Sequence, residues 1–260
     1  MSAVSDTDKE QPFIQHLLEL RQRLLWMIGG VMLVFMVLLP FANPIYELLA
    51  KPLLAHLPQG DHMVAIDPIS PFMAPMKLTL WGAVFIAIPW VLYQLWAFVA
   101  PGLYQHERRL VVPIMVSSIV LFYCGVAFAY YVILPIVFAF ITSTVPHGVS
   151  VMTDISKYLD FVLTMFFAFG AAFEIPVATV ILVLIGVTTP EALVSKRSYV
   201  ILGAFIVAAF FPPNDVVSQT LIALPMWFLF EAGVFFSRFV LRQRSAAAQS
   251  TALDHYNNKV

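Results

Sequence analysis

Cysteine and charged side chains are both scarce in this sequence. Cys124 is the one cysteine in 260 residues, which excludes a disulfide framework and any metal site built from several cysteines. Charged residues make up 11% of the chain, whereas a typical soluble domain has about 25%. The net charge is −1 and the isoelectric point is about 6.6. The sequence therefore lacks the basic surface that nucleic-acid binding requires.

Patterns typical of enzymes are also missing. The six histidines show no metal-ligand spacing, and no G-x-S-x-G, Walker or H-E-x-x-H motif occurs. Cys124 has no cationic neighbour in sequence and is interpreted as an inert small apolar residue. We expect neither catalysis nor a cofactor or bound metal.

Apolar side chains are abundant instead. They make up 61% of the chain, and the mean hydropathy is +0.88. Runs of about 20 apolar residues are long enough to cross the hydrocarbon core of a bilayer as helices. The sequence predicts an all-α polytopic membrane protein with six transmembrane helices. The six predicted spans are Leu24–Phe41, Leu78–Phe98, Val111–Ile136, Tyr158–Gly186, Tyr199–Phe211 and Val216–Phe236.

The distribution of Lys and Arg predicts the orientation. Six spans place both termini on one side, and that side holds eleven basic residues against three on the other. Because basic loops stay in the cytoplasm, both termini are expected there. The three on the outside are Lys51, Lys77 and Lys157. The eleven are Lys9, Arg21, Arg23, Arg108, Arg109, Lys196, Arg197, Arg238, Arg242, Arg244 and Lys259.

Three regions are predicted. Residues 1–23 form an amphipathic cytoplasmic segment, residues 24–236 the membrane domain, and residues 237–260 a tail without apolar periodicity that we expect to be disordered. The fifth span corresponds to about 20 Å of helix, and the sixth to about 22 Å if Glu231 stays at the inner surface. Both are short for a bilayer, so local thinning or a covering partner is expected.

Glu174 is the one acidic residue expected near the middle of the membrane. A carboxyl there costs at least about 2.5–3.5 kcal/mol and is a functional candidate by default. Pro176, two residues later, frees the carbonyl group of Ala172 and predicts a kink. The alternative is a protonated acid that is hydrogen-bonded between helices for packing alone.

Two further carboxylates are expected at the cytoplasmic surface. Glu107 lies in the loop Trp96–Arg109 together with aromatic residues, and a carboxylate can bind a guanidinium group through two hydrogen bonds. Glu19 lies in the N-terminal segment, where pairing with Arg21 or Arg23 is the simpler interpretation. Taken together, the two acids can hold a pair of basic residues on a partner.

Five motifs in order resemble one family. The chain is similar to TatC, the multispanning subunit of the twin-arginine protein translocase, and most to proteobacterial members. The resemblance covers about Phe13 to Arg242. The motifs are His16–Leu24, Ser70–Phe72, Trp96–Arg109, Phe173–Val177 and Phe235–Phe239.

The resemblance implies a concave helical bundle in the bacterial inner membrane. Such a protein binds twin-arginine signal peptides and assembles with TatA- and TatB-type subunits and with further copies of itself. It moves folded proteins across the membrane using the proton-motive force. The resemblance implies that Glu19 and Glu107 receive the arginines and that Glu174 faces a partly hydrated cavity. The patch around the two receiving acids would comprise Arg21, Phe98, Leu103, Tyr104, Arg108 and Arg109.

The same resemblance marks positions for partner subunits and translocation. Pro52 matches a position important for translocation, and Asp215 and Gln219 match the docking region for the small subunits. Many members read Thr-Pro-Pro-Asp before the last span, whereas this chain reads Phe-Pro-Pro-Asn-Asp over residues 211–215. Pro212 replaces the threonine, so one polar group of that cluster is absent.

One other class of function remains compatible with the composition. A proton- or ion-coupled solute transporter would use Glu174 as its coupling site. Such transporters show internal repeats and several polar residues converging at midplane. This sequence shows one acid and no repeat.

Overall fold

The protein is built from helices. The computed structural model describes residues 7–47, 68–99, 111–144, 154–211 and 216–257. By internal contacts it divides into two compact units, one of residues 1–119 and 148–160 and the other of residues 120–147 and 161–260. Five described helices are long and apolar enough to cross a membrane, and Arg197–Ala208 is a shorter apolar helix. These helices match the six predicted spans in order.

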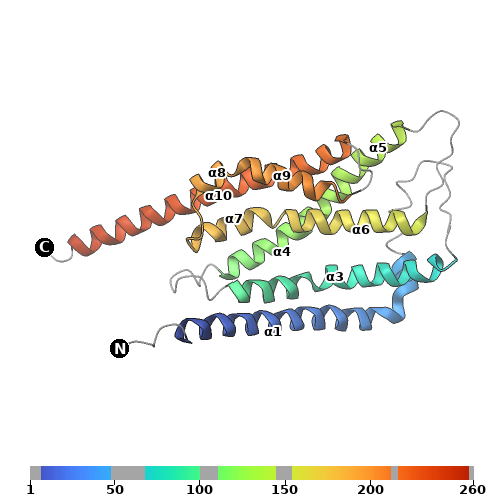
Figure 1. Cartoon of the computed structure of the whole chain (residues 1–260), viewed down its shortest axis with the longest axis horizontal. Coiled ribbons are helices and arrows are strands. Elements are labelled where there is room, and N and C mark those ends of the chain that lie inside the picture. Colours follow the sequence, from blue (N-terminus) through green and yellow to red (C-terminus); the bar gives the residue numbers. More distant parts are fainter. Residues whose placement is uncertain (1–6, 48–67, 100–110, 145–153, 212–215, 258–260) are drawn as a thin grey trace. The chain divides into compact units, whose positions relative to one another are not determined.

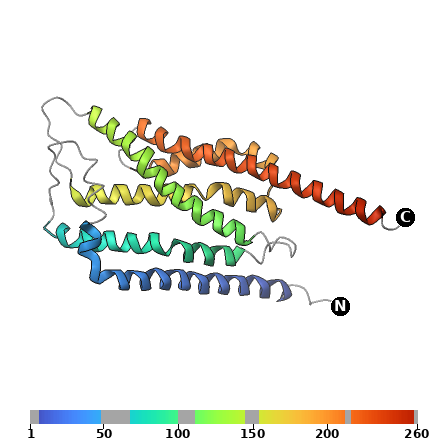
Figure 2. The ribbon, with the colours of Figure 1, turned by 180° about the vertical axis from the view of Figure 1, so that it is seen from behind.

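In the first unit, α1 (Thr7–Leu38) and α3 (Ser70–Val99) lie side by side (Figures 1 and 2). Trp90 lies against Gly30, and its indole N–H donates to the carbonyl oxygen of Trp26 at 3.0 Å. α1 continues as a 3-10 turn, Leu39–Phe41, and residues 42–47 are again helical. Residues 7–23 of the predicted N-terminal segment therefore form one continuous helix with the first span, because no helix breaker separates them.

This close approach yields a prediction about helix packing. A Cβ atom at Gly30 would lie 2.5 Å from Cδ1 of Trp90, whereas one at Gly29 would meet nothing within 4 Å. We expect Gly30→Ala to displace the indole ring and to lower stability by about 1–3 kcal/mol. Thermal unfolding of the two variants in detergent, with Gly29→Ala as the control, measures the difference. Equal stability of the two would show that the ring moves aside at no cost.

Two polar contacts fix further segments to α3. Trp96 donates to the hydroxyl oxygen of Ser118 on α4 at 2.9 Å, and both side chains are buried. Lys77 Nζ lies 2.8 Å from Asp160 on α6. The buried Trp96–Ser118 bond is costly to lose inside a membrane protein, and the more exposed Lys77–Asp160 pair adds less. These contacts hold the beginning of α4 and the beginning of α6 within the first unit.

The third predicted span is a helix with a widened turn. α4 (Val111–Phe128) continues through a π-helical turn, Ala129–Ile133, into α5 (Leu134–Thr144). Pro135 has no N–H to donate to the carbonyl of Tyr131. Just before it, the N–H of Leu134 donates to the carbonyl of Ala129, five residues back, which is the π-helical pattern. The extra residue in this turn carries the helix past the proline.

The fourth predicted span is broken where the sequence predicts a kink. α6 (Ile155–Ala172) and α7 (Ile175–Leu184) are separated by two residues, Phe173 and Glu174. The N–H of Glu174 donates to Ala171 at 3.1 Å, one residue short of the α-helical pattern. Pro176 causes this break because it has no N–H for Ala172.

The chain then turns sharply before its last two spans. Gly186 has φ 76°, a left-handed conformation that ends α7. Thr189 caps α8 (Pro190–Ser195) by accepting from the N–H of Ala192 at 3.2 Å. α8 is a short helix that the sequence analysis did not predict.

The last two helices form a short pair. α9 (Arg197–Ala208) has 12 residues, about 18 Å of helix, which confirms the predicted short span. α10 (Val216–Asn257) packs against α7 and α9. Arg197, at the start of α9, pairs with Glu231 of α10 at 2.6 Å. The pair places Glu231 level with the beginning of α9, so the apolar part of α10 before it is about as short as α9.

The tail differs from the prediction. α10 extends to Asn257, whereas the sequence predicted disorder after residue 236. Alanine has the highest helix propensity, and residues 246–248 are all alanine. Propensity therefore continues the helix where the apolar periodicity ends.

Candidate functional site

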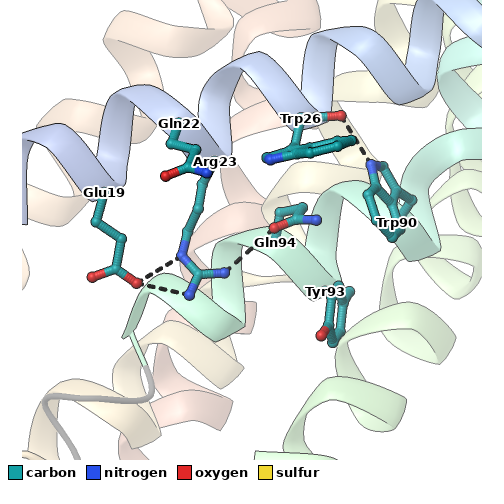
Figure 3. Close-up of a pocket in the computed structure, with 7 residues that line it drawn as sticks. All are labelled: Glu19, Gln22, Arg23, Trp26, Trp90, Tyr93 and Gln94. Atoms are coloured by element: carbon teal, nitrogen blue, oxygen red, sulfur yellow. Dashed lines mark hydrogen bonds and ion pairs between the residues drawn. The ribbon is translucent and has the colours of Figure 1, made fainter.

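A cavity of about 460 Å³ opens between α1 and α3 in the first unit. Charged, amide and aromatic side chains share its wall, and Figure 3 shows how they face one another. The residues that line it are Glu19, Gln22, Arg23, Trp26, Trp90, Tyr93 and Gln94. Those of α1 recur at the spacing of one helix face, and those of α3 do the same. The packing of Trp90 against Gly30 holds the two faces opposite each other.

The carboxylate of Glu19 binds a guanidinium group in this cavity. Nε and Nη2 of Arg23 donate to Oε1 of Glu19 at 2.9 and 2.7 Å. The two residues are one helical turn apart, where oppositely charged side chains meet readily. Of the two interpretations left open for Glu19, the pairing with a helical neighbour is the one present in the structure.

Gln94 reaches the same guanidinium group from α3. Its Oε1 atom accepts from Nη1 of Arg23 at 3.4 Å, and the residue is only 7% exposed. The Arg23 side chain thus contacts polar oxygens on both helices (Figure 3). An amide oxygen and a carboxylate together form an acceptor set suited to a planar cation with several donors.

Three aromatic rings form the apolar part of the wall. The rings of Trp90 and Tyr93 lie 5.8 Å apart between centroids, and Trp26 lies on α1 near Trp90 (Figure 3). All three side chains remain exposed. Aromatic faces attract guanidinium groups and also accept apolar side chains. The cavity can therefore hold an arginine-containing peptide segment.

The structure describes only part of the predicted peptide-binding patch. Glu19 lines the cavity, Arg21 is exposed on α1, and Phe98 lies one turn beyond Gln94 on α3. The rest of the predicted patch lies outside the described residues, and so do Pro52 and Asp215. Those patch residues are Leu103, Tyr104, Glu107, Arg108 and Arg109.

Several cavity residues were missed by the sequence analysis. Trp26, Trp90, Tyr93 and Gln94 lie outside the five motifs, and Gln22 lies inside the first motif but was not singled out. The signal that identifies them is polar and aromatic side chains at i, i+3 and i+4 on two neighbouring helices. That signal becomes informative only when the two helices are known to pack face to face.

Glu174 lies in the second unit, at the break between α6 and α7. Its Oε1 atom is shielded from solvent. Phe173, the neighbour of Glu174 in sequence, packs against Phe128, whose ring centroid lies 5.6 Å from that of Phe173 and 5.7 Å from that of Phe169, both pairs tilted.

Gln219 is half-buried in the first turn of α10. Within the ranges that the structure describes, no group of three or more His, Cys, Asp or Glu side chains is arranged to hold a metal ion.

Fold and site together define a class: a multispanning helical membrane protein with a guanidinium-holding cavity beside its first span. Comparison with known proteins identifies the family. Residues 15–225 match the family described as Sec-independent protein translocase protein (TatC). The chain belongs to the TatC family.

Individual relatives agree with this assignment. The chain is 55% identical over 237 residues to the Escherichia coli K12 Sec-independent protein translocase protein TatC, covering 91% of each chain. It is 52% identical over 248 residues to the Azotobacter chroococcum protein of the same name, covering 95% of this chain and 97% of that one. A crystal structure described as the twin arginine translocase receptor TatC superposes with a TM-score of 0.77 at 36% identity. That match covers 86% of this chain and 98% of the other.

Proposed function

We propose that this protein is the receptor for twin-arginine signal peptides and the core of a translocase for folded proteins. Its membership in a translocase family favours this function over an enzyme or a solute transporter. The observation that carries the proposal is the contact of the Glu19 carboxylate with a guanidinium group inside an open, aromatic cavity. Such a site suits a peptide arginine, and the apolar wall suits the residues beside it.

Two consecutive arginines call for a second acidic group. Glu107 is proposed as that group, because it follows α3 in sequence by a few residues and α3 contributes Gln94 and Tyr93 to the cavity. Arg21, Phe98, Leu103, Tyr104, Arg108 and Arg109 would complete the surrounding patch.

The proposal includes an orientation and partners. The excess of Lys and Arg on one side supports cytoplasmic termini in a bacterial inner membrane, so the cavity faces the compartment where precursors are made. Single-span TatA- and TatB-type subunits would dock along the short last spans, with Asp215 and Gln219 as polar contacts and Pro52 needed for translocation. The proton-motive force would drive transport.

Peptide binding to the full chain in detergent tests the proposed function. A fluorescent signal peptide with two consecutive arginines is compared with the same peptide carrying two lysines. Because a guanidinium group forms several directed hydrogen bonds and an ammonium group acts as a point charge, we expect the arginine peptide to bind at least about tenfold more tightly. Equal affinities would contradict a twin-arginine receptor.

Glu174 is proposed to contribute a buried polar group that translocation requires. Glutamine keeps the hydrogen-bonding capacity of the side chain, whereas leucine removes it and leaves buried partners unsatisfied. We expect Glu174→Gln to retain most export of a folded reporter and Glu174→Leu to lose about tenfold or more. Export rates at matched protein levels measure this. Equal loss in both variants would instead point to a carboxyl that must titrate.

A further inference from the structure

We propose that Arg23 is an internal ligand of Glu19, which occupies the carboxylate until a peptide arginine displaces it. The inference rests on the proposed function, because it assumes that Glu19 receives a peptide arginine. Two nitrogens of Arg23 donate to the same carboxylate oxygen at 2.9 and 2.7 Å, and a third nitrogen reaches Gln94 at 3.4 Å. The chain's own guanidinium group thus makes, inside the cavity, the contacts that an incoming arginine would make.

The partial burial of Arg23 and Glu19 is compatible with replacement of Arg23 by a peptide arginine. The side chains of Arg23 and Glu19 are 23% and 35% exposed. A partly buried ion pair is screened less by solvent than a fully exposed pair, whose contribution is small. Both groups nevertheless reach the surface, so Arg23 can swing out and be rehydrated while the peptide enters. An exchange of one guanidinium group for another keeps the charge of the site constant.

The helices do not depend on Arg23 for their packing. The contact between Arg23 and Gln94 is at the long limit of a hydrogen bond. α1 and α3 are held elsewhere, by the indole ring of Trp90 over Gly30 and by its bond to the carbonyl of Trp26. Release of Arg23 therefore leaves the shape of the cavity intact, as a displaceable ligand requires and as a structural bridge would not allow.

The internal ligand is expected to weaken the binding of arginine and lysine peptides alike. The protein binds the peptide only in the state in which Arg23 has left Glu19. The apparent dissociation constant is therefore the intrinsic constant divided by the fraction of protein in that state. In the proposed exchange a peptide cation takes the Oε1 atom that Arg23 holds. Arg23 must therefore leave first, and arginine and lysine peptides are weakened by the same factor. The internal ligand thereby sets an affinity threshold, while the ratio between the two peptides stays unchanged. For a weakly matching peptide, the apparent dissociation constant then lies above the concentration at which the peptide is present, so the peptide stays unbound.

Affinities of the two peptides for Arg23→Gln in the full chain test the proposal. We expect both peptides to bind about threefold to tenfold more tightly than to the unaltered protein, by the same factor for each. Arg23→Lys keeps the charge but loses the forked contact, and we expect a smaller gain of the same sign. Arg238→Gln removes one positive charge from an exposed position on α10 and serves as the matched control, with no change expected.

The double variant Glu19→Gln/Arg23→Gln separates competition from simple charge repulsion. Competition requires the carboxylate, so Arg23→Gln gives no gain when Glu19 is already glutamine. The same gain in both backgrounds would show that only the positive charge matters, and this would overturn the proposal.

Two other results for Arg23→Gln would also overturn the proposal. Weaker binding of both peptides to Arg23→Gln would make Arg23 a positioning residue, and unchanged binding would show that it does not compete; either result overturns the inference. Failure of the proposed function is recognised separately, by an unaltered protein that binds both peptides equally or by Glu19→Gln retaining full arginine affinity.

Discussion

Replacing Glu19 by glutamine is expected to weaken binding of a twin-arginine signal peptide by about tenfold to a hundredfold. Hydrogen bonds to a charged group contribute about 1.5–3 kcal/mol, and the glutamine amide keeps one acceptor oxygen but loses the negative charge and the second acceptor oxygen of the carboxylate. Fluorescence anisotropy of the labelled peptide with the full chain in detergent measures the loss.

The matched control for this variant is Glu191→Gln. Glu191 is exposed in the first turn of α8, so the same chemical change occurs away from the cavity. We expect it to bind the peptide with unaltered affinity. Wild-type affinity in Glu19→Gln, with the control behaving as expected, would remove Glu19 from the site.

Gly125→Ala is expected to cause the largest loss of stability of any Gly→Ala substitution among the described glycines of the second unit. A Cβ atom there would overlap the backbone carbonyl oxygen of Phe169 and lie 2.9 Å from Cα of Gly170. Backbone cannot move aside as a side-chain tip can, so α4 and α6 must separate. Overpacking of this kind costs about 1–3 kcal/mol or more, against a gain in helix propensity of about 1 kcal/mol.

Thermal unfolding in detergent, together with the yield of monodisperse protein, measures this effect. Gly203→Ala is the control, because a Cβ atom at Gly203 on α9 meets nothing within 4 Å. The control gains the same helix propensity without the clash and should be at least as stable as the unaltered protein. If Gly125→Ala unfolds at the same temperature as the control, the close approach of α4 to α6 is not required.

Much of the fold is readable from the sequence because a membrane protein must satisfy its backbone within each helix. Apolar run length therefore locates the spans, and Pro176 predicts the break before α7 correctly. The ends of the helices are less predictable. α1 extends back to Thr7 and α10 on to Asn257, since polar helical residues add nothing to an apolar run. The short α8 depends on a local cap at Thr189 and has no periodicity to detect.

The site is predictable only in part, for a different physical reason. Glu19 is recognisable as a carboxylate near the membrane surface, and both of its possible roles were open from sequence. The choice of Arg23 over Arg21 as its partner follows from the i, i+4 geometry. Gln94, Trp90 and Tyr93 join Glu19 only through the packing of α3 on α1, which depends on the fit of an indole ring over Gly30. The spacing of these residues on each helix is visible in the sequence, but the sequence alone does not show that the two helix faces meet.

Site-specific photocrosslinking in native membranes tests the central claim most directly. A photoreactive residue is placed at position 98 or 104, and the bait is a precursor whose signal peptide carries two arginines or two lysines. The account predicts crosslinks from these positions that require the arginines and that disappear in Glu19→Gln. Crosslinks of equal yield to both precursors, or none from a correctly inserted protein, would contradict a twin-arginine receptor site at this cavity.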